Sequence, residues 1–410
     1  KKFKMKPMIL LVTILPFLHG LMKDNNTGEA WGYVDVREGA HIFWWLYGQS
    51  ANTPKNPTRP LVMWLQGGPG ASSTGFGNLA EVGPLDENLS PRSGPWTSLA
   101  DMLFVDAPVG SGFSYVEPPD TYTSTESQID EDLYQFLKKF LSEMPEYQNT
   151  PFYIFGESYG GKMGASFGVR LQGGIQSGDV RANLRGLILG DAWISPTDSV
   201  ATWAPFLKDA NLISPTGFEA VSQMTKQTVD AADSGRYQEA TELWKQTQGV
   251  IFQNTNNVNP FNIQQHNAPS CNKESTNALM NGQIRQKLQI IPPNVIWDSH
   301  RNDVFAAQSQ EFMRPVINEV GQLLSSGLKV VIIQGQLDLL CDSPGTDAWI
   351  KKLPWGDLPQ YLAAPLTTMS QGKMRRYKNL IYYDVSNAGH MVPIDKPSAG
   401  LEILQLAISD

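Results

Sequence analysis

One serine stands between two glycines in the segment Gly156-Glu157-Ser158-Tyr159-Gly160, directly after the apolar run Pro151 to Phe155. A serine in this G-x-S-x-G pattern is typical of a nucleophile elbow, a tight strand-to-helix turn that raises the hydroxyl above the edge of a parallel sheet. Backbone N–H groups beside such a turn can stabilise an oxyanion. Ordinary strand-to-helix turns also match the five letters, but the segments on both sides fit an elbow. The sequence therefore predicts Ser158 as a nucleophile.

A serine nucleophile needs a base, and the chain has five histidines. His390 lies in a loop after the strand expected at Leu380 to Val385. A loop at that place can reach a serine at the edge of the sheet, although a lone histidine is more often structural. His300 is the alternative. Position favours His390 as the general base.

A carboxylate that orients the histidine is expected between Ser158 and His390, because α/β-hydrolases have the chain order serine, acid, histidine. Asp191 and Asp338 both follow expected strands. Either of them can simply cap the next helix, and composition does not choose between them. The acid usually follows a late strand, the one just before the strand that leads to the histidine, and this favours Asp338.

The elements that must position these residues are those of an interrupted α/β protein. A helix with one apolar stripe is expected between Ser127 and Tyr147, ending before Pro145. Because it lies between two expected strands, it completes the β–α–β unit of a mostly parallel sheet. The predicted fold is an α/β-hydrolase with a central mostly parallel sheet and an inserted helical lid. Short apolar strands are expected at His41 to Tyr47, Leu61 to Leu65, Met102 to Val105, Phe152 to Phe155, Leu184 to Leu189, Leu328 to Ile333 and Leu380 to Val385.

The stretch of residues 195–300 differs from the rest of the chain. Ser214-Pro215 predicts the start of a helix, and a passage rich in asparagine and glutamine runs from Gln253 to Asn267. Helical patterns cover Phe218 to Ala231 and Tyr237 to Ile251. We interpret the stretch as a helical lid inserted between two parts of one core, residues 23–194 and 301–410. A separate domain bounded by linkers is the alternative.

The N-terminus predicts where the protein goes. Four lysines among the first six residues precede an apolar stretch from Met8 to Leu18, which is too short to span a bilayer. Residues 1–22 are therefore interpreted as a signal peptide, and the protein is expected to be secreted or lysosomal, without stable insertion into a membrane. The sequons at Asn25 and Asn88 are candidate glycosylation sites that suit this route.

Composition limits the partners of the protein. Its 410 residues include 32 basic and 40 acidic ones, for a net charge of −8, which argues against nucleic acid. Cys271 and Cys341 are too few for a disulfide framework, and the sequence leaves open whether they pair. No spacing of cysteine and histidine indicates zinc, so neither a metal nor another cofactor is expected. The oligomeric state is not predicted.

Four motifs, in order along the chain, resemble the signatures of serine carboxypeptidases. They are Trp64-Leu65-Gln66-Gly67-Gly68-Pro69-Gly70-Ala71-Ser72-Ser73, Gly156-Glu157-Ser158-Tyr159-Gly160-Gly161, Gly335-Gln336-Leu337-Asp338-Leu339-Leu340-Cys341 and Gly389-His390-Met391-Val392-Pro393. The match runs from about Trp31 to the C-terminus, and the segments 72–78 and 83–86 resemble the retinoid-inducible subgroup in particular. The resemblance implies an exopeptidase that removes single residues from the C-termini of peptides and proteins.

The resemblance also implies a role for each matching residue. Ser158 is then the nucleophile, His390 the general base and acid, and Asp338 the residue that orients the imidazole. The backbone N–H groups of Gly68 and Tyr159 form the oxyanion hole.

A network that holds the terminal carboxylate of the substrate falls, by the same resemblance, on Trp64, Gln66, Glu81 and Glu157. Gln66 stands where the family usually has asparagine. Two glutamates and a substrate carboxylate in one pocket cannot all stay ionised cheaply, so one glutamate should hold a proton with a raised pKa. Peptides are therefore expected to bind best in mildly acidic solution. An esterase or acyltransferase with the same triad, or a non-catalytic binding or chaperone protein, is the alternative function.

Overall fold

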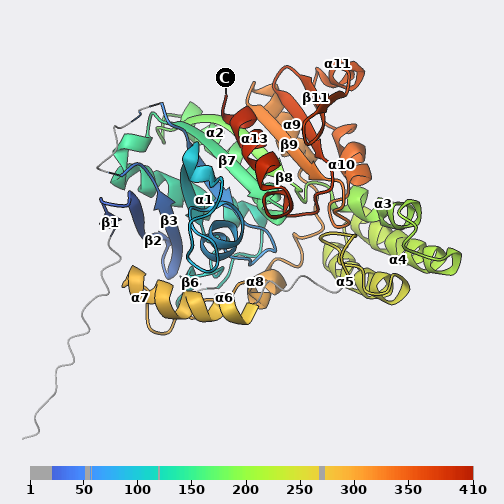
Figure 1. Cartoon of the computed structure of the whole chain (residues 1–410), viewed down its shortest axis with the longest axis horizontal. Coiled ribbons are helices and arrows are strands. Elements are labelled where there is room, and N and C mark those ends of the chain that lie inside the picture. The colour runs from blue at the N-terminus through green and yellow to red at the C-terminus, as the bar shows by residue number, and fades with distance from the viewer. Residues whose placement is uncertain (1–20, 51–55, 57, 119–120, 267–272, 410) are drawn as a thin grey trace, which may run out of the picture.

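The computed structural model describes residues 21–409, except 51–55, 57, 119–120 and 267–272. Within the described residues a twelve-stranded sheet runs through the molecule in the order β1-β2-β3-β5-β4-β7-β8-β9-β12-β11-β10, and β6 pairs with β3 off this path (Figure 1). The strands are β1 (Met22–Asp24), β2 (Glu29–Arg37), β3 (Ala40–Tyr47), β4 (Leu61–Leu65), β5 (Asp101–Val105), β6 (Tyr115–Val116), β7 (Pro151–Glu157), β8 (Asn183–Gly190), β9 (Lys329–Gly335), β10 (Thr367–Met369), β11 (Gly372–Tyr377) and β12 (Leu380–Val385).

The middle of the sheet is parallel and its two ends are antiparallel. Strands β5, β4, β7, β8, β9 and β12 pair in parallel, whereas β1 to β3 and β10 to β11 join by antiparallel pairs. A parallel strand between two helical layers is buried on both faces, which explains the continuous apolar run of β4. The mostly parallel sheet expected from the sequence is therefore present.

Helices cover both faces of the sheet. Along β3, Trp44 belongs to one hydrophobic core, with the apolar stripe of α1, and the next residue, Trp45, belongs to the other. This division follows from the alternation of side chains along a strand. Helices α1, α2 and α9 contribute to the first core and α13 to the second. The α-helices are α1 (Glu126–Glu143), α2 (Tyr159–Gln176), α3 (Pro196–Asp209), α4 (Pro215–Asp233), α5 (Tyr237–Asn254), α6 (Lys273–Leu279), α7 (Arg285–Leu288), α8 (Asn302–Ala307), α9 (Ile317–Ser325), α10 (Ser343–Ile350), α11 (Leu358–Ala363), α12 (Val392–Asp395) and α13 (Pro397–Ile408).

The expected elements are present, with small shifts at their ends. Each of the seven expected strands lies within two residues of an observed one, and the helix expected between Ser127 and Tyr147 is α1. Two π-helical segments, η1 (Ser73–Val82) and η4 (Met280–Ile284), and the short antiparallel strands at the sheet ends were not predicted. The N-terminal residues 1–20, which carry most of the expected signal peptide, lie outside the described residues.

The helices of the stretch 195–300 up to α7 form two separate groups in the molecule. Helices α3, α4 and α5 pack on one another beside α10, at the right of Figure 1. Segment α6–η4–α7 lies at the lower left, where Trp31 Nε1 of β2 donates to the carbonyl of Leu288 at 2.9 Å. As expected, Ser214 caps α4: its hydroxyl accepts from the backbone N–H of Gly217 at 3.1 Å.

Candidate active site

Ser158 occupies a strained turn between β7 and α2. Its φ of 57° and ψ of −125° are rare for a residue other than glycine. The flanking glycines are required by packing: a Cβ on Gly156 would lie 2.2 Å from the carbonyl oxygen of Gly160, and one on Gly160 would lie 2.0 Å from that of Leu65. The G-x-S-x-G pattern is therefore the sequence of a nucleophile elbow.

The loop after β4 lies directly against the serine. A Cβ on Gly67 would come within 2.6 Å of the Cβ of Ser158, and Gly68 has a φ of +109° that favours glycine. Tyr159 is the first residue of α2, so its backbone N–H points out of the helix N-terminus without a partner inside the helix. Gly68 and Tyr159 thus lie on the two segments that flank Ser158.

A buried carboxylate braces the loop that carries Gly68. Asp106 is fully buried and accepts from Ser72 Oγ at 2.8 Å and from the backbone N–H groups of Thr74 and Phe113 at 3.0 and 2.9 Å. Burial raises the pKa of Asp106, and these hydrogen bonds act in the opposite direction. The brace fixes the loop beside the serine.

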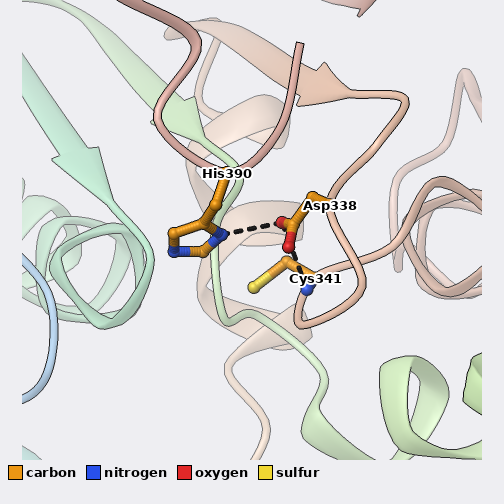
Figure 2. A group of neighbouring side chains, drawn as sticks. All are labelled: Asp338, Cys341 and His390. Atoms are coloured by element: carbon orange, nitrogen blue, oxygen red, sulfur yellow. Dashed lines mark hydrogen bonds and ion pairs between the residues drawn. The ribbon is translucent and has the colours of Figure 1, made fainter. Parts of the chain in front are cut away.

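The histidine and the aspartate expected from the sequence meet in the structure. His390 Nδ1 lies 2.7 Å from Asp338 Oδ2, and both side chains are buried (Figure 2). Asp338 also accepts from the backbone N–H groups of Leu340 and Cys341, at 2.8 and 3.2 Å. Burial lowers the pKa of His390, but the charge and hydrogen bond of Asp338 and the charge of Glu157 outweigh it, so the pKa is raised overall. Such a contact orients the ring and stabilises the imidazolium.

Asp191 and His300, the alternatives that the sequence left open, lie near His390 and Asp338 but make other contacts. Asp191 accepts from the backbone N–H of Gly335 at 2.7 Å and from Gln334 Nε2 at 3.0 Å. Burial, and next the charge of Asp338, raise the pKa of Asp191 well above its usual value. His300 lines the same cavity as His390 but belongs to a segment that pairs with Ala71. The contact with His390 distinguishes Asp338 from Asp191.

A chain of buried hydrogen bonds runs beside the serine. Trp64 Nε1 donates to Gln66 Oε1 at 2.7 Å, and Gln66 Nε2 donates to Glu157 Oε1 at 2.7 Å. Glu81, on η1, is also buried and lies close enough to Glu157 to act on its pKa. Burial raises the pKa of Glu157, opposed by the charge of His390 and by the side chains of Glu81 and Gln66. Two buried carboxyl groups this close cannot both ionise cheaply, so one of them is expected to hold a proton.

A cavity of about 740 Å³ opens over these residues. Its polar lining includes Gln66, Glu157, Ser158 and His390. The aromatic part of its wall includes Trp193, Trp244, Phe261, Phe305 and Phe312. A cavity with an apolar wall and a few converging polar groups is typical of a site for a small or extended ligand.

The cavity also borders the one group of metal-ligand side chains found among the described residues. Ligand atoms of Asp338, Cys341 and His390 lie within 4.8 Å of one another (Figure 2). Burial and the neighbouring carboxylates raise the pKa of the Cys341 thiol well above its usual value, which disfavours the thiolate that a metal needs. Cys271, the other cysteine, lies outside the described residues.

The aromatic wall and the contact of Phe261 with His390 had no signal in the sequence. The aromatic wall comes from four separate segments, so no local pattern marks it. The carbonyl of Phe261 accepts from the backbone N–H of His390 at 2.7 Å, although Phe261 lies in the polar passage after α5. The candidate glycosylation residues Asn25 and Asn88 are both exposed, in turns.

Comparisons with known proteins show the family of this chain. The chain matches the serine carboxypeptidase family over residues 20–410. It is 41% identical to the retinoid-inducible serine carboxypeptidase of Homo sapiens, over 97% of this chain and 96% of that protein. It is 36% identical to serine carboxypeptidase-like 51 of Arabidopsis thaliana, with the same coverage of 97% and 96%.

A solved structure has the same fold. Kex1(delta)p, a prohormone-processing carboxypeptidase from Saccharomyces cerevisiae, superposes with a TM-score of 0.80 at 23% identity, over 93% of this chain and 91% of that one. This likeness confirms the predicted α/β-hydrolase fold. With a family match across nearly the whole length and a relative above 40% identity, the chain belongs to the serine carboxypeptidases.

Proposed function

We propose that this protein is a serine-type carboxypeptidase that removes amino acids from the C-termini of peptides and proteins. The observation that carries the proposal is that Ser158, His390 and the Gln66–Glu157 pair line one cavity. A nucleophile with its base accounts for hydrolysis, and a buried polar network beside them accounts for a preference for a free terminal carboxylate.

The chemistry follows from the positions of the side chains. Ser158 Oγ attacks the last peptide carbonyl while His390 takes its proton, and Asp338 stabilises the resulting imidazolium. The backbone N–H groups of Gly68 and Tyr159 stabilise the negative oxygen of the tetrahedral intermediate. His390 then gives the proton to the leaving amine, the C–N bond breaks, and an acyl-enzyme remains. Water, activated by the same histidine, releases the shortened peptide.

The carboxyl pair provides the grip on the substrate. A protonated Glu157–Glu81 pair can donate a hydrogen bond to the terminal carboxylate, whereas a fully ionised pair repels it. Because the pKa of Glu157 is raised, this proton persists to a higher pH than on an ordinary glutamate. Trp64 fixes the orientation of the Gln66 amide by donating to its oxygen, which leaves the NH₂ group for acceptors.

The test compares an N-blocked dipeptide that has a free C-terminus with its C-terminal amide. The amide removes an acceptor from the network, so kcat/KM should fall by about 10- to 100-fold, equivalent to about 1–3 kcal/mol. Ser158→Ala, measured in parallel, shows the background. Better cleavage of the amide or of a simple ester would support an esterase or acyltransferase instead. A native protein whose Ser158 fails to react with an organophosphonate would be a binding protein with a vestigial site.

Two proposals concern the rest of the chain. The stretch of residues 195–300 acts as a lid, because α5 supplies Trp244 to the cavity wall.

The protein enters the secretory route, because the basic and apolar N-terminus is followed by exposed sequons at Asn25 and Asn88. Glycosidase treatment of protein secreted by eukaryotic cells should lower its mass, and Asn25→Gln with Asn88→Gln should remove that change. Along the described parts of the chain, no helix has the length and apolar character to cross a membrane.

A further inference from the structure

A compact loop from the inserted stretch contacts the segments that carry His390 and Asp338. Residues 258–266 follow α5, and a bridge between Val258 and His266 closes them. The backbone N–H of Asn259 also donates to the carbonyl of Gln265 at 2.8 Å. Five of its nine residues are polar, and two of these, Asn259 and Asn262, are buried together with the apolar residues Val258, Pro260 and Ile263. A buried polar loop needs partners for its backbone groups, and they are found beside the triad.

The loop holds the Asp338 segment on both sides. The backbone N–H of Leu339 donates to the carbonyl of Pro260 at 3.0 Å, and that of Ile263 donates to the carbonyl of Leu337 at 2.9 Å. Asp338 lies between these two bonds. Its backbone is therefore tied to the loop immediately before and immediately after the carboxylate.

The same loop holds the His390 segment through its backbone. The N–H of His390 donates to the carbonyl of Phe261 at 2.7 Å, and the two rings lie 5.3 Å apart between centroids. A Cβ on Gly389 would come within 2.1 Å of the same carbonyl oxygen. The glycine before the histidine is thus required by the approach of the loop.

One pair of side chains completes the contact. Asn262 Nδ2 donates to Asp395 Oδ2 at 2.8 Å, and the backbone N–H of Gly389 donates to the same oxygen at 2.7 Å. Asp395 ends α12, five residues after His390. This carboxylate therefore links the loop, the residue before the histidine and the helix after it.

We infer that Asn262 and Asp395 are positioning residues that hold His390 at the angle its proton transfers require. The inference rests on the proposed function, in which His390 is the base for Ser158. Neither residue lines the cavity, so we assign both a role through His390 rather than a contact with substrate. A small rotation of the imidazole lowers the rate of the chemical steps and leaves peptide binding unchanged.

The test is Asn262→Asp, which sets a second carboxylate against Asp395. We expect kcat, and the rate at which an organophosphonate labels Ser158, to fall about tenfold or more at neutral pH, with KM for a blocked dipeptide within about twofold of native. The double variant Asn262→Asp with Asp395→Asn removes the repulsion between two carboxylates, but the oxygen that it replaces also accepts from the backbone N–H of Gly389, so it should recover only part of the loss. Gln264→Glu is the matched control, because it adds the same charge at an exposed place in the same loop.

Three outcomes would overturn the inference. These are a single variant that matches Gln264→Glu in both rates, a double variant as slow as the single one, and a loss confined to KM. If Asn262→Asp does not fold, Asn262→Ala removes the donor to Asp395, together with the acceptor of the Gln264 backbone N–H, and must still slow labelling several-fold without changing KM. A native protein that no organophosphonate labels would instead refute the proposed function, so the two failures are distinguishable.

Discussion

Replacing Glu157 with glutamine should make substrate binding nearly independent of pH. The change keeps the shape of a protonated carboxyl group: the new Oε1 still accepts from Gln66, and the new amide donates toward Glu81 without titrating. In the native protein the raised pKa of Glu157 means that the pair holds its proton in acid and loses it as pH rises. Loss of one proton on which binding depends raises KM by up to tenfold per pH unit, or about 1.4 kcal/mol. The peptide carboxylate is mostly ionised from about pH 4 upward, because its pKa is about 3.5.

The assay is hydrolysis of an N-blocked dipeptide from about pH 4 to about pH 8, with kcat and KM determined at each pH. Native KM should rise with pH, whereas the KM of Glu157→Gln should be nearly flat. Asp130→Asn is the matched control: the pKa of Asp130 is raised to about 8, first by burial and then by the charge of Glu126, but its side chain does not line the cavity. That variant should keep the native slope. An equally steep rise of KM in Glu157→Gln would refute the assignment of the shared proton to this pair.

Three further predictions concern the triad and Gln66. Ser158→Ala and His390→Ala should each lower kcat by several orders of magnitude in folded protein, as measured by steady-state kinetics. Asp338→Asn should lower kcat far more than Asp191→Asn does. The reverse order for the two aspartates would show that Asp338 is not the acid of the triad. As the solution is acidified, kcat should begin to fall at a pH above the usual histidine pKa, because the pKa of His390 is raised and the base must be neutral. A fall that begins only at or below the usual histidine pKa would contradict the role of Asp338. Gln66→Asn restores the residue usual in the family, so peptide hydrolysis should persist. Loss of selectivity for free C-termini in this variant would show instead that binding of the terminal carboxylate requires the longer side chain.

Local sequence patterns were sufficient for the elements that have a simple period. Strand β4 is an unbroken apolar run, and its predicted ends at Leu61 and Leu65 agree with the structure. Strand β2 was missed because Glu29, Gly32 and Asp35 interrupt its apolar residues, although most of the strand is buried. Glu29 is nevertheless buried: it accepts from Trp45 Nε1 at 3.0 Å, a partner that the sequence does not reveal.

The candidate site was predictable only where a motif carried it. Ser158 and His390 stand in segments whose glycines are required by close packing, so their patterns are specific. Asp191 and Asp338 look alike in sequence, since each follows a strand, and their local patterns do not separate them. Tertiary contacts decide between them: Asp338 contacts the imidazole of His390, whereas Asp191 accepts from the backbone N–H of Gly335 and the side-chain amide of Gln334. The positioning loop was missed for the same reason, because its partners lie more than 70 residues further along the chain.

The buried carboxyl groups also predict how stability depends on pH. Burial raises the pKa values of Glu157, Asp191 and Asp342, and that of Glu126 to about 7. A carboxyl whose pKa is higher in the folded than in the unfolded state binds more protons when folded, so the free energy of unfolding falls as pH rises above the unfolded pKa of about 4. Each such group removes up to about 1.4 kcal/mol per pH unit until its folded pKa is passed.

Thermal unfolding should therefore give a higher Tm near about pH 5 than near about pH 8. Glu126→Gln removes one of these groups without altering the cavity lining, so it should reduce the difference in Tm between the two pH values. Glu131→Gln is the matched control, because the pKa of Glu131 on the same helix is lowered by its side-chain hydrogen bonds, against a raising effect of desolvation. That variant should not reduce the difference. A native Tm that rises from the acidic to the alkaline condition would mean that these carboxyl groups are ionised and paired in the folded state, and the protonated Glu157–Glu81 grip would lose its physical basis.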